Sequence, residues 1–337
     1  MKYATFKFNG MKMIGALLDE YLVDVQRAYA LYLKEVEKDN QADEMARVLI
    51  PDDFIEFLEA GEKSWEAAKT AYNFVKDMDK ETLGINEEYI FYPLKNVKIL
   101  EPLRPRTIMA PGPELEDPSD KSMYNYIEFY LKSEHAVVGP GVPIIKESKF
   151  TGRIDFEPEL ALVIGKRGRF LDRENVLDHV FGYTIMNDVY SIDRLVVGWE
   201  GTMFHVRYGE GASFDNSAPI GPWIVTKDEI ENPENLTLRK YVNGELVDER
   251  NTSQLLRSVR EFASYCSTYF TLQPGLMIAT GYPNGLVFGK DSNNRPVIKD
   301  LRKSPRYLNA DDRVACEIEG IGRLENLVIE FDGGNSK

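Results

Sequence analysis

The chain has 337 residues, of which 43% are hydrophobic and 28% are charged, a balance that is ordinary for a globular protein with a sizeable core. Its net charge of −14 argues against nucleic acid and against an anionic membrane surface as partners. No apolar run approaches the roughly 20 residues of a membrane-spanning helix, and the first ten residues lack the apolar core of a secretion signal.

Residues 1–96 are predicted to form a small N-terminal accessory domain of α/β type. Apolar and polar residues alternate from Tyr3 to Phe8, and the Asn9-Gly10 pair that follows is a hairpin signal. From Gln26 the spacing of apolar residues becomes helical. Prolines around residue 97 mark the boundary to a larger domain, residues 97–337. A turn-rich loop at 110–120 then precedes the core of that domain, and we expect it to act as a lid.

Three carboxylates are expected to meet in the centre of the larger domain. Glu157 and Glu159 are two apart in a predicted strand, so their side chains leave the same face. Asp188 follows a second apolar strand-like run, Val180–Met186. Carboxylates that converge in a poorly solvated place need a cation between them, and oxygen ligands suit Mg²⁺, Mn²⁺ or Ca²⁺. The alternative is a solvent-facing strand end and an ordinary turn.

The rest of the chain is predicted to alternate between strands and one helix. Asn243-Gly244 indicates a hairpin, and residues 254–269 form an amphipathic helix pattern. A strand then runs into Thr280 and Gly281. The basic stretch 286–309 is expected to be a solvated loop, and two final strands close the core.

Several ordered motifs resemble the fumarylacetoacetate hydrolase family from near Val97 to the end of the chain. They are the acidic pair that opens ELALVIG, then GYTIMND, SFDNSAPIGPWIVT (213–226), the NGE hairpin with Asn251-Thr252, LQPGLMIATGYPNG (272–285) and EIEGIGRLENLV (317–328). The resemblance implies an α+β, predominantly β fold: a mixed β-sandwich roll catalytic domain with a small N-terminal α/β domain.

The resemblance also implies roles for individual residues. Glu157, Glu159 and Asp188 would be the metal ligands. Lys132 would neutralise charge on the substrate or its enolate, unless it is a solvated surface lysine. The substrate-binding residues would be Asn187, Tyr190, Thr280 and Gly281, although Thr280-Gly281 also fits an ordinary turn at a strand end.

The chain departs from the family pattern around the expected base. Phe129 stands where many members have a water-activating His, which places hydrolysis in doubt. Glu134 and His135 are the candidates for a base in its place, and two mutually exclusive alignments place His135 differently. We expect the remaining histidines, His179 and His205, to be structural.

The resemblance predicts a divalent-metal enzyme that hydrolyses a C–C bond in an acylpyruvate-like acid through a metal-bound enolate. The alternatives are a lyase or isomerase of 2-oxo acids (a decarboxylase, a tautomerase or a dehydratase of 2-keto-3-deoxy sugar acids), or a non-catalytic binding protein. Mg²⁺, a small 2-oxo acid substrate and a homodimer are expected. Cys266 and Cys316 lack any pairing motif, so we expect buried free thiols in a reducing cytoplasm.

Overall fold

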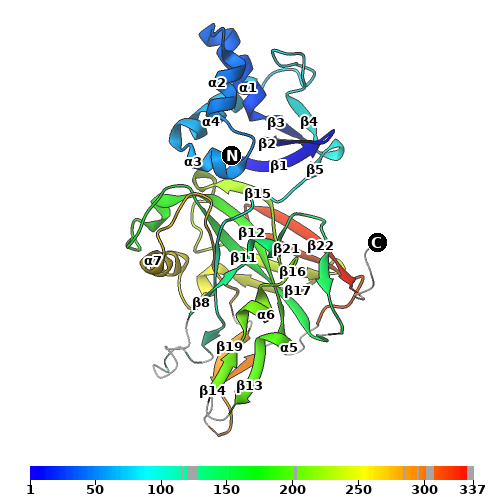
Figure 1. Ribbon diagram of the computed structural model, residues 1–337, viewed down its shortest axis with the longest axis vertical. Helices are drawn as coiled ribbons and strands as arrows, with labels where there is room; N and C mark the ends of the chain where they lie inside the picture. Colours follow the sequence, from blue (N-terminus) through cyan, green and yellow to red (C-terminus); the bar gives the residue numbers. More distant parts are fainter. Residues whose placement is uncertain are drawn as a thin grey trace.

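A computed structural model of the chain describes residues 1–115, 117, 119, 128–149, 151–200, 203–283, 286–293, 296–300 and 307–331. Figure 1 shows a helix-rich lobe from the N-terminal part of the chain above a larger lobe made mostly of strands. Residues 116, 118 and 120 of the predicted lid and the side chain of His205 lie outside the described residues. No helix in the described part of the chain is both long and apolar enough to cross a lipid bilayer.

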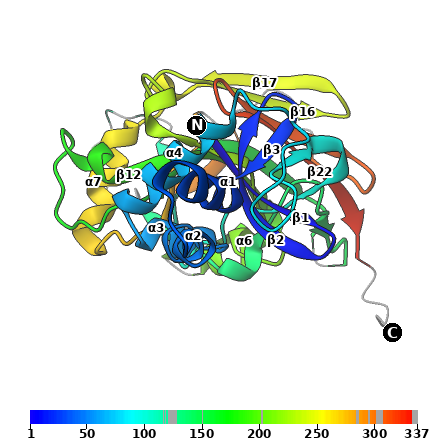
Figure 2. The ribbon, with the colours of Figure 1, turned by 90° about the horizontal axis from the view of Figure 1, so that it is seen from above.

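The N-terminal lobe joins four strands to four helices. Its strands are β1 (Lys2–Phe8), β2 (Met11–Leu18), β3 (Tyr21–Asp24) and β4 (Phe91–Pro93). Its helices are α1 (Val25–Tyr32), continued by a π-helix (Leu33–Glu37), α2 (Ala42–Leu49), α3 (Phe54–Glu59) and α4 (Glu62–Val75). The Asn9-Gly10 pair adopts positive φ angles of 47° and 88° and closes the predicted hairpin. Seen from above, the helices gather on one side of β1–β3 (Figure 2).

One large sheet runs through both lobes, in the order β4-β3-β2-β1-β15-β12-β11-β18-β6-β8. Its strands in the larger lobe are β6 (Ile108–Pro111), β8 (Phe129–Lys132), β11 (Ile154–Ile164), β12 (Val180–Ser191), β15 (Ala218–Thr226) and β18 (Met277–Ala279). Two short strands pair with its members, β5 (Lys98–Ile99) with β1 and β9 (Val137–Val138) with β15. Lys2 and Tyr3 of β1 pair with Val225 and Ile224 of β15, which joins the lobes edge to edge. The division at residue 97 remains a prediction.

A second sheet packs on one face of the first. Its order is β10 (Ile144–Lys146), β22 (Gly322–Glu330), β21 (Arg313–Ile318), β16 (Thr237–Val242) and β17 (Glu245–Asn251). Alternate residues of β11, among them Phe156, Leu160 and Leu162, enter the core between the sheets. The intervening positions of β11, which carry Glu157 and Glu159, face the other way.

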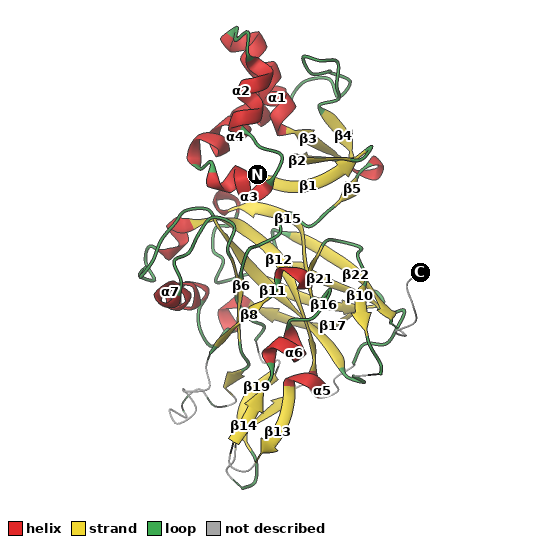
Figure 3. Ribbon diagram, viewed as in Figure 1, coloured by secondary structure: helices red, strands yellow, loops and turns green. Residues whose placement is uncertain are grey.

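The remaining elements are short. They are α5 (Ile192–Leu195), β13 (Val196–Glu200), β14 (Met203–Val206), α6 (Tyr208–Ala212), α7 (Val259–Tyr269), and the sheet β20 (Pro296–Asp300), β19 (Leu286–Lys290) and β7 (Glu114–Leu115). In Figure 3, α7 lies at the left of the larger lobe, and the other labelled ones lie in its lower part. Single 3-10 turns span Leu94–Asn96, Glu134–Ala136, Val176–His179, Lys227–Glu229 and Thr252–Gln254.

Two local predictions differ from the structure. The helix predicted for 254–269 begins only at Val259, because Ser258 caps it by accepting a hydrogen bond from Glu261 N. The stretch 286–309 contains the β19–β20 hairpin where a loop was expected, while residues 301–306 lie outside the described part. The predicted fold class, α+β and predominantly β with a mixed sandwich, is confirmed.

Candidate active site

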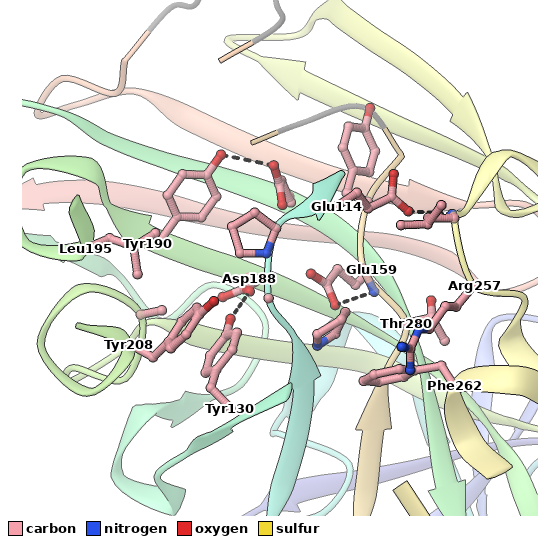
Figure 4. Close-up of a pocket in the computed structure, with 18 residues that line it drawn as sticks. Glu114, Tyr130, Glu159, Asp188, Tyr190, Leu195, Tyr208, Arg257, Phe262 and Thr280 are labelled. Carbon is pink, nitrogen blue, oxygen red and sulfur yellow. Dashed lines mark hydrogen bonds between the residues drawn. The ribbon is translucent and has the colours of Figure 1, made fainter. Parts of the chain in front are cut away.

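Two neighbouring strands place three carboxylates around one pocket. Glu157 of β11 lies directly opposite Asp188 of β12 in the antiparallel register, and Glu159 lies opposite Met186, two residues further along. Residues paired in this way stand on the same face of a sheet. All three carboxylates line one pocket in the larger lobe, together with Tyr130, Tyr190 and Thr280 (Figure 4).

Strand β18 carries Thr280 and Gly281 to the same pocket, because β18 pairs with β11 at Ala279 and Ala161. Gly281 N donates a 2.9 Å hydrogen bond to Glu159 Oε2, so this backbone donor already serves a carboxylate of the protein. Thr280 is 4% exposed, and its hydroxyl has no hydrogen-bond partner in the described part of the chain. This buried hydroxyl is available to a ligand in the pocket.

Asp188 is held by two side chains of β8. Lys132 Nζ lies 2.7 Å from Asp188 Oδ1, and the Tyr130 hydroxyl donates to Asp188 Oδ2. Lys132 is buried, donates to the carbonyls of Ala212 and Ser217 as well, and does not line the pocket. In this structure Lys132 therefore neutralises Asp188 from outside the pocket. The family resemblance predicted that it would neutralise charge on the substrate or its enolate.

Glu157 belongs to a second polar group that reaches the other sheet. The Tyr190 hydroxyl donates to Glu157 Oε1 at 3.0 Å. Asp155, two residues before Glu157, is fully buried and forms a 2.7 Å ion pair with Lys240 of β16. Lys240 thereby brings a positive charge from the second sheet to the edge of the acidic cluster.

Burial and mutual repulsion disfavour the charged forms of the pocket acids. Burial, followed by the nearby Asp188, raises the pKa of Glu157 to about 8, although Lys240 opposes the shift. Burial, Asp188 and Glu157 raise the pKa of Glu159 well above its usual range. Counted with every acid ionised, four carboxylates (Asp155, Glu157, Glu159 and Asp188) face two ammonium groups (Lys132 and Lys240). Two negative charges are left without a counter-charge inside this cluster.

That residual charge matches a single divalent cation. In the described part of the chain, no three acidic, histidine or cysteine side chains are gathered around one point as metal ligands would be. Asp188 instead turns to Lys132 and Tyr130, and Glu159 turns to Gly281. The donor set still fits a hard ion, because it consists of carboxylate oxygens with two uncompensated charges in a poorly solvated place. Reorientation of the glutamate side chains would be needed to gather them.

Other predicted residues lie outside the pocket. Glu134 and His135 are exposed on the 3-10 turn Glu134–Ala136, and neither lines the pocket. Asn187 is fully buried and does not line the pocket, because it stands on the opposite face of β12 from Asp188. His179 Nδ1 lies 3.2 Å from the Lys166 carbonyl oxygen. Both cysteines are buried free thiols, as predicted.

Some pocket residues were missed by sequence reasoning. Tyr130 stacks on Tyr208 with ring centroids 4.6 Å apart, and the two rings form part of the pocket wall. Glu114 and Arg257 line the pocket as well. A period of two would have identified Tyr130 from Lys132. No local pattern marks Arg257.

Comparison with known families matches most of the larger lobe to one family. Residues 112–329 match the family described as Fumarylacetoacetate (FAA) hydrolase C-terminal. A Xenopus laevis protein named oxaloacetate tautomerase fahd2, mitochondrial, is 33% identical over 283 residues, which cover 81% of this chain and 77% of the relative. Bacillus subtilis oxaloacetate tautomerase YisK is 31% identical over 336 residues, covering 97% and 100%.

Solved structures share the fold over almost the whole chain. A fumarylacetoacetate hydrolase from Exiguobacterium antarcticum has a TM-score of 0.70 and 29% identity, covering 98% of this chain and 100% of that one. A maleylpyruvate hydrolase from Sphingobium sp. SYK-6, solved with manganese(II) and pyruvate, has a TM-score of 0.65 and 22% identity, covering 98% and 99%. At that identity the second likeness concerns the fold alone.

Proposed function

Because the chain belongs to the fumarylacetoacetate hydrolase family, we propose that it is a metal-dependent tautomerase that interconverts the enol and keto forms of a 2-oxo acid, with oxaloacetate as the best candidate. The similarity to two oxaloacetate tautomerases, one of them matched along 97% of this chain, supports the proposal. The sequence predicted C–C hydrolysis with tautomerisation as an alternative, and the similarity to these relatives favours the alternative.

One observation carries the choice: the pocket is lined by carboxylates and tyrosines, and no histidine is among its described lining residues. C–C hydrolysis needs a base that activates a water molecule against an acyl carbon. Tautomerisation needs only a proton moved between carbon and oxygen beside a stabilised enolate. The exposed position of His135, the one histidine that was a candidate base, supports this choice.

We assign the pocket residues as follows. Glu157, Glu159 and Asp188 would hold the divalent ion, which when bound polarises the 2-oxo group and stabilises negative charge on its oxygen. The Thr280 hydroxyl, buried and without a partner in the described chain, donates to the substrate carboxylate. Glu114, the described pocket carboxylate outside this ligand set, carries the proton to and from C3.

The ion that we propose is Mg²⁺, with Mn²⁺ or Ca²⁺ as alternatives, because all three accept oxygen ligands. A homodimer is also proposed, on the family resemblance. Equilibrium dialysis against each metal and sedimentation of the purified protein test these two points separately.

C–C hydrolysis of an acylpyruvate is the second candidate. The likeness to the Exiguobacterium antarcticum fumarylacetoacetate hydrolase, at 29% identity over 98% of this chain, favours it. The two reactions share the metal and the enolate, and they differ in whether water attacks a carbon.

The deciding experiment adds metal-loaded protein to freshly dissolved enol-oxaloacetate and follows loss of the enol absorbance, beside acylpyruvates in a C–C cleavage assay. We expect rapid ketonisation with wild type, none above background after chelation, and a kcat lowered roughly 100-fold or more by Glu114→Gln, the range for a lost general base. Cleavage of acylpyruvates without ketonisation of oxaloacetate would replace the proposal by the hydrolase.

A further inference from the structure

A single cationic side chain, Arg257, is present among the described residues that line the pocket. It is half-buried and directly precedes Ser258, the N-cap of α7. Its guanidinium carbon lies 4.4 Å from the centroid of the Tyr265 ring, so the aromatic face supports the side chain. No ion pair or hydrogen bond joins the guanidinium to another described residue. Figure 4 shows its side chain among the pocket residues, in the part of the view that also holds Phe262 and Thr280.

Two cations beside the acidic cluster, and one close to Arg257 in sequence, each pair with a carboxylate of the chain. Lys132 and Lys240 each pair with a buried aspartate at 2.7 Å. Arg260, three residues further along the chain, lies 3.8 Å from Glu234, contacts the Arg173 carbonyl and does not line the pocket. Arg257 differs because its donors face a pocket and are not used by any residue that the structure describes. A guanidinium offers two parallel donors that match a carboxylate.

A backbone contact holds Arg257 near the proposed proton-transfer residue. Leu256 N donates a 2.6 Å hydrogen bond to Glu114 Oε1, which ties the segment before α7 to β7. Glu114 and Arg257 therefore belong to one wall, while the ligand acids come from β11 and β12. In a four-carbon 2-oxo dicarboxylate, C3 lies between the 2-oxo group and the distal carboxylate. When C3 of such a molecule lies at Glu114, its distal carboxylate lies close by, where Arg257 can bind it.

We infer that Arg257 is a specificity-determining residue that binds the distal carboxylate of a dicarboxylic substrate. This inference rests on the proposed function, because it assumes that the 2-oxo end of the substrate lies at the three acids. The inference also goes beyond the proposed function, since a cation at Arg257 would make the enzyme prefer dicarboxylic to monocarboxylic 2-oxo acids. A substrate with an apolar distal group would leave the guanidinium without an anion.

The test compares Arg257→Leu, Arg257→Lys and the matched control Arg260→Leu in Mn²⁺-loaded protein. The first readout is kcat/KM for ketonisation of enol-oxaloacetate against enol-phenylpyruvate, which lacks a distal carboxylate. Loss of a charge-assisted hydrogen bond lowers kcat/KM for oxaloacetate by roughly 10- to 100-fold, mostly through KM, and leaves phenylpyruvate within about threefold. Arg257→Lys recovers part of the loss, and Arg260→Leu changes neither substrate.

The second readout does not require turnover. Malate and lactate share a 2-hydroxy acid end and differ by the distal carboxylate, so calorimetric titration of both gives a preference for malate in wild type. Arg257→Leu removes that preference if the inference holds. Equal losses for both ligands, or an unchanged ratio in a folded Arg257→Leu protein, would overturn it. Absence of ketonisation with a malate preference that depends on Arg257 would refute the tautomerase alone.

Discussion

Two of the places where the described part of the chain buries carboxylates have different charge balances. In the N-terminal lobe, Asp24 is 3% exposed and caps α1, accepting hydrogen bonds from Gln26 N and Arg27 N at 3.1 Å each. Arg27 Nε lies 3.3 Å from its second oxygen. In the larger lobe, Glu157, Glu159 and Asp188 share a pocket. Together with Asp155 they face two buried lysines that lie outside the pocket lining, so two charges of the acidic cluster are uncompensated.

The difference shows that a buried acid is not by itself a sign of a functional site. Asp24 has a raised pKa, about 6, because burial outweighs Arg27 and its backbone donors, and it is still explained by the start of one helix. Glu157 and Glu159 have raised pKa values with no helix to cap, because they are buried and are repelled by Asp188 on the paired strand. Residual charge that the protein leaves unmatched points to a ligand.

The largest expected effect follows from removing one pocket acid. Glu159→Gln should weaken metal retention more than roughly 100-fold, the upper range for groups that only support a ligand, and should abolish activity. Metal content after dialysis, with circular dichroism to verify folding, measures it. Asp24→Asn removes an equally buried carboxylate as a control and should retain metal fully. Equal retention by Glu159→Gln and wild type would reject the ligand set.

A second variant tests whether Lys132 serves Asp188. Lys132→Met leaves Asp188 buried without its ammonium, and breaking such a pair costs about 3–5 kcal/mol of unfolding free energy. The control is Lys146→Met, since Lys146 is also buried but donates to the Leu308 carbonyl. Its loss should cost less, about 1–3 kcal/mol. Denaturant unfolding of both variants gives the comparison.

The same experiment extends to a double variant. Adding Asp188→Asn to Lys132→Met should restore part of the lost stability, because the uncompensated charge is removed along with its partner. If the losses of unfolding free energy in the two single variants simply add in the double variant, Lys132 acts on the fold independently of Asp188.

The smallest effect concerns Asp24. Asp24→Ala loses the α1 cap and should cost about 1–2 kcal/mol, whereas Asp24→Asn keeps a capping oxygen. Because the folded pKa of about 6 exceeds the carboxyl group's ordinary pKa of 3.8, the stability contributed by this carboxyl is fully present below about pH 4 and is lost as the pH rises through about 6. Asp24→Asn does not titrate, so its stability relative to wild type should increase by up to about 3 kcal/mol over that interval. Thermal unfolding at pH 4 and pH 7 measures the change, and a difference independent of pH would contradict it.

Much of the site was readable because strands impose a period of two. Glu157 and Glu159 had to share a face wherever the strand lay, and the Asn9-Gly10 turn had to reverse the chain, since these properties depend on neighbours in sequence. The motifs around them were sufficient to predict the family and the fold class, which the comparisons confirm.

The lysine partners of the buried acids could not be predicted from the period of two along a strand. Lys240 reaches Asp155 across 85 residues of sequence, and Lys132 of β8 reaches Asp188 of β12 although β6, β18 and β11 stand between these two strands in the order of the sheet. Strand order and sheet packing decide those contacts, because a side chain's partner across a sheet is set by register and not by spacing along the chain. The sequence by itself determined which acids share a face. Only the tertiary structure decided which cations neutralise them, that Glu134 and His135 stand on the surface, and that Arg257 opens into the pocket.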